Sequence, residues 1–168
     1  MKIEISESAL IAAAQQEGYD AFVNTVANAI KTNAGGELTA EILQKLTAEQ
    51  ITLWGFTLLH EEVMDGGFVQ LIYNGYGPFI FLNPLAKALR LWGLKDLSKL
   101  LYDGRALYEL HGRAIESEEL SDDEFMALFE QYPDFDDLDD RFIESEEYYM
   151  QLVAEYIDQH LEHFVQVS

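Results

Sequence analysis

Hydrophobic side chains recur three and four residues apart along nearly the whole chain, and no segment shows the strict alternation of a half-buried strand. Spacings of three and four place hydrophobic residues on one face of an α-helix. Between positions 19 and 32, for example, the pattern is formed by Phe22, Val23, Val26 and Ile30. The pattern predicts an all-α fold, a single compact multi-helix domain over residues 1–168 with short connections.

Local start and stop signals divide this pattern into helices. "TAEQ" at 47–50 and "SDDE" at 121–124 are capping boxes, in which two residues satisfy each other's backbone N–H groups. Asn83-Pro84 is an N-cap followed by proline, and Gly35-Gly36 can end a helix in the left-handed conformation. We expect helices over residues 6 or 8 to 16, 19–32, 39–45, 47–64, 84–92, 94–115, 121–132 and 145–164.

One stretch of the chain is far more acidic than the rest. "DFDDLDDRFIESEE", residues 134–147, holds eight carboxylates and one arginine. Its hydrophobic positions predict one helical face, formed by Phe135, Leu138, Phe142 and Ile143. Ser145 is expected to cap a last helix with its hydrophobic residues on one side. Four acids, at positions 147, 155, 158 and 162, would lie on another side of that helix. The acids are therefore expected on ordered helices.

The net charge of −21 is concentrated at the C-terminal end of the chain. Residues 1–113 carry 13 acids and 9 bases, whereas residues 114–168 carry 18 acids and a single base, Arg141. Such a surface repels nucleic acid and anionic membranes and attracts cationic surfaces. Simple solubility is the alternative explanation of an acidic composition.

Other classes of protein are disfavoured by what the sequence lacks. There is no cysteine, which excludes disulfides and thiolate sites. No run of hydrophobic residues is long enough to span a membrane, and the first residues lack the basic start of a signal peptide. We expect a soluble cytoplasmic protein.

Catalytic patterns are scarce. "HEEVMD" at 60–65 resembles a zinc-protease helix, but Met64 stands where the second histidine is needed. His160 and His163 lie three residues apart near a helix end, where their positive charge suits the helix dipole. "GYGP" at 75–78 is not followed by the lysine of a phosphate-binding loop. No catalytic residue, metal site or cofactor is predicted, and we expect a protein that is not an enzyme.

The most distinctive segment is "EEVMDGGFVQLIYNGYG", residues 61–77. Two glycines end one helix there, Phe68 begins another, and Gln70 and Asn74 are placed to cap or bridge the turn. Together with "ALRLWGL" at 88–94 and "LDDRF" at 138–142, this segment resembles the DNA-mimic protein family over roughly residues 48–165. The matching positions are Glu62, Gly66, Gly67, Phe68, Gln70, Asn74, Gly77, Ala88, Leu89, Gly93, Leu138, Asp139 and Phe142.

The resemblance implies a small acidic helical protein, often a homodimer, that occupies the DNA-binding face of a transcription regulator. Residues 76–84, "YGPFIFLNP", depart from the shorter and more polar connection expected in that family. Their hydrophobic run at 79–82 is either core or part of a dimer surface.

The leading hypothesis is a non-enzymatic DNA mimic that binds a basic DNA-binding protein, without binding nucleic acid itself. Each surface carboxylate would stand in for a phosphate and accept hydrogen bonds from arginine and lysine. The alternatives are an immunity or antitoxin protein that neutralises a basic nuclease and, in another class, a carboxylate-dependent hydrolase. The predicted partner-binding residues are Asp134, Asp136, Asp137, Asp139, Asp140, Glu144, Glu146, Glu147, Glu155, Asp158 and Glu162.

Overall fold

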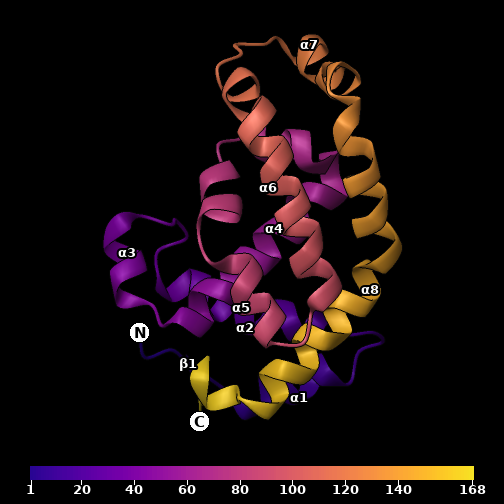
Figure 1. The fold of residues 1–168 in the computed structure, drawn as a ribbon. Helices are drawn as coiled ribbons and strands as arrows, with labels where there is room; N and C mark the ends of the chain where they lie inside the picture. The colour runs from indigo at the N-terminus through magenta and orange to yellow at the C-terminus, as the bar shows by residue number, and fades with distance from the viewer. The chain divides into compact units, whose positions relative to one another are not determined.

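The computed structural model describes all of residues 1–168 and confirms the all-α fold class (Figure 1). Contacts within the chain divide it into two compact units. Unit 1 comprises Met1–Thr57 and Glu147–Ser168, and unit 2 comprises Leu58–Glu146. The helices α4 (Ala48–Tyr73) and α8 (Asp136–Gln159) each begin in one unit and end in the other. That the chain forms one domain stays a prediction.

Unit 1 consists of parts of α4 and α8 and of six elements from the two ends of the chain. The six elements are β1 (Glu4–Ile5), α1 (Glu7–Ala14), α2 (Asp20–Asn33), α3 (Ala40–Lys45), η4 (Leu161–His163) and β2 (Gln166–Val167). The Ser6 hydroxyl caps α1 and the Thr39 hydroxyl caps α3, each accepting a backbone N–H. The buried side of α2 is formed by Val23, Val26 and Ile30, as their spacing predicted.

The predicted capping box at the start of α4 also joins distant parts of unit 1. The Gln50 backbone N–H donates to the Thr47 hydroxyl at 3.1 Å, and the Thr47 N–H donates to the Gln50 side chain at 3.0 Å. The buried Gln50 amide then donates to the carbonyls of Met1, at 2.8 Å, and Phe164, at 2.9 Å. One polar side chain thus connects both ends of the chain to α4.

Unit 2 is arranged around the helix α6 (Lys95–Glu116), which lies between α5 (Leu85–Leu91) and the first part of α8 (Figure 1). Leu97, Leu100 and Leu101 bury the hydrophobic face of α6. The remaining elements are η1 (Pro78–Leu82), α5 (Leu85–Leu91), α7 (Asp122–Met126), η2 (Leu128–Gln131) and η3 (Pro133–Phe135). The η1 segment is a single π-helical turn that packs against α5 and α6.

A break at the double glycine divides α4 into two helical parts. Gly67 has φ of 80° and ψ of −178°, a conformation that L-residues with a side chain rarely adopt. Phe68 begins the second part with a fully buried ring. The predicted helix end at this point is confirmed, and its left-handed residue is Gly67 alone.

The prediction that Ser145 begins the last helix was wrong. α8 runs without interruption from Asp136 to Gln159, because the buried positions Phe142, Tyr149 and Val153 keep one helical spacing on both sides of Ser145. Helical structure gives way to the 3-10 turn η4 and to β2 before the chain ends. Ile143, expected on the buried face, is 48% exposed because it lies at the edge of that face.

Three smaller expectations also need correction. The Asn83 side chain donates to the carbonyl of Phe79 and does not cap α5, whose N-cap is Pro84. The helix that begins at Asp122 ends at Met126 and continues only as the 3-10 turns η2 and η3. The chain also contains one strand pair, since β1 and β2 are parallel over two residues each, too short to show a period in the sequence.

The segment at 76–84 belongs mainly to the core of unit 2. Ile80 and Phe81 are buried, and the Phe81 ring stacks on Tyr108 with centroids 5.3 Å apart. Leu82, at the end of the turn, is 53% exposed. The core interpretation therefore applies to two of the four hydrophobic residues, and the dimer surface stays a prediction.

Candidate protein-interaction surface

The acids of α8, together with Asp134 of the preceding turn η3, fall into two sets that differ in what they contact. The first set lies on the face opposite to the buried one and repeats every three or four residues along the helix, interrupted only by Gln151. We call these six residues the outward carboxylates: Asp136, Asp140 and Glu144 in unit 2, and Glu147, Glu155 and Asp158 in unit 1.

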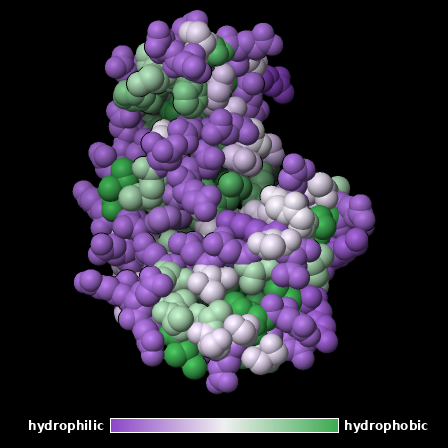
Figure 2. All heavy atoms as spheres, turned by 180° about the vertical axis from the view of Figure 1, so that it is seen from behind, coloured by the Kyte–Doolittle hydropathy of each residue, from purple (hydrophilic) through white to green (hydrophobic).

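The outward carboxylates are exposed and almost entirely free of partners. All six are classed as exposed, and only Glu155 takes part in a hydrogen bond, accepting from the Gln151 amide at 3.0 Å. None of the six forms an ion pair with a lysine or arginine. Their hydrogen-bonding capacity is therefore available to a cationic partner. The surface in Figure 2 is mostly hydrophilic, with separate patches of hydrophobic side chains.

The second set is bonded within unit 2, and we call it the bonded carboxylates: Asp134, Asp137, Asp139 and Glu146. Asp134 lies 3.0 Å from the His111 imidazole, and Glu146 lies 2.8 Å from that of His60. Asp137 lies 3.5 Å from the Arg141 guanidinium.

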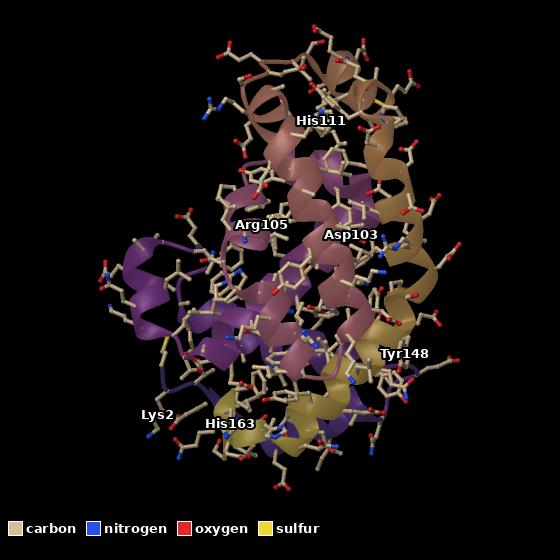
Figure 3. All side chains as sticks on the ribbon, in the orientation of Figure 1. Lys2, Asp103, Arg105, His111, Tyr148 and His163 are labelled. Carbon is tan, nitrogen blue, oxygen red and sulfur yellow. The ribbon has the colours of Figure 1, made fainter.

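Arg141 also donates to Asp103 at 3.1 Å, and this contact joins α8 to α6. Asp103 lies on the side of α6 that faces α8, and Arg105 projects from the opposite side (Figure 3). Together with the two histidine contacts, this arginine fixes how the first part of α8 lies within unit 2.

Asp139 has the most distinctive position in the second set. Its carboxylate accepts the Phe68 backbone N–H at 2.8 Å and thereby caps the second part of α4. Burial raises the pKa of Asp139 from 3.8 to about 6, and the charges of Asp136 and Asp140 add to the rise. The hydrogen bond from the Phe68 N–H lowers this pKa but does not offset the effect of burial. A Cβ atom at Gly67 would lie 2.6 Å from this carboxylate, so the glycine is required for the close approach.

The residues predicted to bridge the double glycine do so. The Gln70 amide donates to Glu62 and to Asp65, each at 3.0 Å, and the Asn74 amide donates to Glu62 at 3.0 Å. These bonds cross the break in α4 from one helical part to the other. The structural motif that positions the two parts of α4 thus consists of Gly66, Gly67, Phe68, Gln70 and Asn74.

Apart from Arg141, four residues from Asp137 on the same helix, the partners of the bonded carboxylates could not be found from the sequence. His60 and Glu146 are 86 positions apart, His111 and Asp134 are 23 apart, and Phe68 and Asp139 are 71 apart. No local pattern signals such pairs. Of the other predicted residues, Glu162 is exposed on η4 with a carboxylate oxygen 3.7 Å from the neighbouring His163.

The residues considered for catalysis have structural neighbours. His60 pairs with Glu146, Glu62 accepts the two amides, and the rings of His160 and His163 lie 5.4 Å apart. No three histidine or acidic side chains are grouped so that they could hold a metal ion. No helix has the length and hydrophobicity needed to cross a lipid bilayer.

The fold and the surface define an acidic all-α protein that displays exposed carboxylates without cationic partners along α8. Residues 44–160 match the family described as DMP19-like protein. A curated relative, DNA mimic protein DMP19 of Neisseria meningitidis serogroup B, is 41% identical over 128 residues, which cover 76% of this chain and 78% of the relative. The chain belongs to the DMP19-like protein family. The resemblance inferred from residues 61–77, 88–94 and 138–142 is confirmed.

Proposed function

We propose that this protein is a DNA mimic without enzymatic activity, which occupies the cationic DNA-binding face of a transcription regulator. The observation that carries the proposal is the row of outward carboxylates, exposed and without cationic partners. The name of the relative from Neisseria meningitidis supports the same role. The outward carboxylates would receive arginine and lysine side chains that otherwise bind phosphates.

The spacing of the carboxylates is compatible with this role. Asp136, Asp140 and Glu144 follow one another at intervals of four residues, a rise of about 6 Å each on an α-helix. Phosphates on one DNA strand advance about 3.4 Å per step, so two steps cover about 6.8 Å. A side chain long enough to reach alternate phosphates can therefore reach successive carboxylates of this row.

The charge of each unit supports the same interaction. Unit 2 carries 20 acids and 7 bases, and unit 1 carries 11 acids and 3 bases. Both units are therefore negative, and each contributes outward carboxylates from its own part of α8. A field of one sign speeds the encounter with a basic protein and disfavours direct contact with nucleic acid.

A competition titration tests the proposal. A DNA-binding protein that co-purifies with this chain at low salt is mixed with its fluorescent DNA duplex, and increasing amounts of the chain are added at several salt concentrations. We expect displacement of the duplex, with a salt dependence that is present but shallower than that of DNA, because DNA also releases condensed counterions. A ternary complex, or binding indifferent to salt, would contradict mimicry.

Two triple variants, each lacking three negative charges, test whether the outward carboxylates form the binding surface. The outward variant Asp136→Asn, Asp140→Asn, Glu144→Gln should weaken competition about tenfold, since three exposed charge pairs contribute about 0.5 kcal/mol each. The control variant Glu7→Gln, Glu17→Gln, Glu37→Gln removes three exposed acids elsewhere and should have a much smaller effect. Equal effects would mean that net charge, not this face, drives binding. Inhibition of a basic nuclease without displacement of DNA would instead favour the neutralising role.

A further inference from the structure

A pocket in unit 1 opens beside two of the outward carboxylates. It lies where the end of α1, the start of α2 and the later turns of α8 meet, and its volume is about 270 Å³. The lining residues are Ala14, Gly18, Tyr19, Phe22, Ala154, Glu155 and Asp158.

The pocket is open because small residues stand at its edges. Ala14 and Ala154 contribute single methyl groups, and Gly18 has no other atom within 4 Å of the position its Cβ would take. Gly18 has φ of 78°, so the turn between α1 and α2 also requires a glycine. Tyr19, the next residue, remains 42% exposed and presents its ring at the pocket.

The chemistry of the lining combines aromatic rings with negative charge. Phe22 and Tyr19 supply aromatic surface, and Glu155 and Asp158, three residues apart on α8, supply two carboxylates. Neither carboxylate has a cationic partner, and none of the lysines of unit 1 lines the pocket. A group that suits this lining is flat and positively charged and donates several hydrogen bonds.

We propose that this pocket binds an arginine side chain of the partner protein. The inference rests on the proposed function, since it identifies one anchor of the same cationic partner. A guanidinium can stack on the face of Tyr19 while its N–H groups donate to Glu155 and Asp158. A lysine ammonium is a compact, strongly hydrated charge without a planar surface to stack, so the pocket distinguishes arginine from lysine.

Most of the residues that line the pocket lie before the part of the chain that matches the family. Ala14, Gly18, Tyr19 and Phe22 precede residues 44–160, the part that matches the DMP19-like protein family. Only the α8 side of the pocket falls within the match. The N-terminal helices therefore convert part of an evenly charged helix face into a concave site with its own preference.

Two cationic peptides test the inference. Acetylated nona-arginine and nona-lysine are titrated into the full-length protein, with affinity measured by calorimetry and the site followed by the amide NMR signals of Gly18 and Ala154. We expect both signals to shift with nona-arginine at lower concentrations than with nona-lysine. Tyr19→Ala should weaken nona-arginine binding about fivefold, the loss of one cation–π contact, and Asp158→Asn should weaken it to a similar degree.

Matched controls separate the pocket from general acidity. Tyr148 is 54% exposed on α8, does not line the pocket and is visible in Figure 3, so Tyr148→Ala should leave nona-arginine binding unchanged. Glu147→Gln removes the same charge as Asp158→Asn from the same helix, outside the pocket, and should have a clearly smaller effect. Circular dichroism of each variant confirms that α1 and α2 remain folded.

The outcomes also separate this inference from the proposed function. Equal binding of the two peptides, or equal effects of Tyr19→Ala and Tyr148→Ala, would overturn the arginine pocket and leave mimicry by distributed charge intact. Failure of both peptides to bind the unaltered protein would overturn the pocket and weaken the proposed function as well. A shift of the Gly18 signal with nona-arginine that Tyr19→Ala abolishes would support the pocket directly.

Discussion

The two sets of carboxylates lie on α8 or, for Asp134, on the turn η3 directly before it, yet their surroundings differ. Asp140 faces solvent without a partner, whereas its neighbour Asp139 is half-buried and accepts the Phe68 N–H. A rotation of about 100° per residue around the helix axis separates the two environments. Acidic composition therefore identifies neither set by itself.

The two sets of carboxylates have different roles in the protein. Glu146 and Asp139 join α8 to α4 through His60 and the Phe68 N–H. Asp134 joins η3 to α6 through His111, and Asp137 pairs within α8 with Arg141, which itself reaches Asp103 on α6. These contacts hold the first part of α8 in place within unit 2, and the outward carboxylates of that part are thereby presented on a fixed support. Rigid presentation favours binding because little conformational freedom is lost on association.

The largest effect is expected at the point where a bonded carboxylate meets the break in α4. Gly67→Val forces a β-branched residue into a left-handed conformation and places its Cβ against Asp139, so we expect a loss of at least about 3 kcal/mol in the free energy of unfolding. Urea denaturation followed by circular dichroism measures the loss.

Gly75→Val is the matched control for this variant. Gly75 also has a positive φ, of 89°, but no atom lies within 4 Å of its Cβ position. This variant should lose only about 1–2 kcal/mol, the cost of the backbone conformation. Equal losses at the two glycines would mean that the approach of Asp139 contributes nothing, and a stable Gly67→Val protein with lost binding would make this motif part of a binding site.

A smaller effect, and one of opposite sign, is expected for Asp139→Asn at neutral pH. Because burial raises the pKa of Asp139 from 3.8 to about 6, the carboxyl group's contribution to stability is complete below pH 3.8 and is lost as the pH rises through about 6. Asparagine keeps an oxygen for the Phe68 N–H and cannot ionise. We expect the variant to be more stable by about 1–2 kcal/mol at pH 7.5, an amount discounted for partial exposure of the group.

Urea denaturation of both proteins from pH 7.5 to 4.5 measures this difference. The advantage of Asp139→Asn should shrink steadily as the pH falls, and the contributions of groups that do not interact with Asp139 cancel in the comparison. An advantage independent of pH, or a variant less stable at pH 7.5, would show that the hydrogen bond to the ionised carboxylate outweighs its burial.

The smallest effect on stability is expected for the outward set. The triple variant Asp136→Asn, Asp140→Asn, Glu144→Gln removes like charges four residues apart, which repel by about 0.2–0.5 kcal/mol per pair. It also removes Asp136 from the favourable N-terminal end of the helix. The free energy of unfolding should therefore stay within about 0.5 kcal/mol. A large loss would show that these residues support the fold and would remove the contrast between the two sets.

The sequence by itself determined the elements whose signals are local. The helical spacing of Val23, Val26 and Ile30, the capping box of Thr47 and Gln50, and the double glycine before Phe68 all have the predicted roles, because each depends on residues a few positions apart. Ser145 shows the limit of such signals. A serine can cap a helix, but burial on both sides of it makes a continuous α8 more favourable.

Only the tertiary structure decided which acids are bonded and which face outward. The sequence placed all eleven predicted carboxylates in one class, since each lies on or near the same acidic helix. The contacts of Glu146, Asp139 and Asp134 depend on His60, Phe68 and His111, which approach from α4 and α6 across 23 to 86 positions of chain. Hydrogen bonds at such separations depend on which helices pack against each other, and the spacing of residues within one helix does not specify its neighbours.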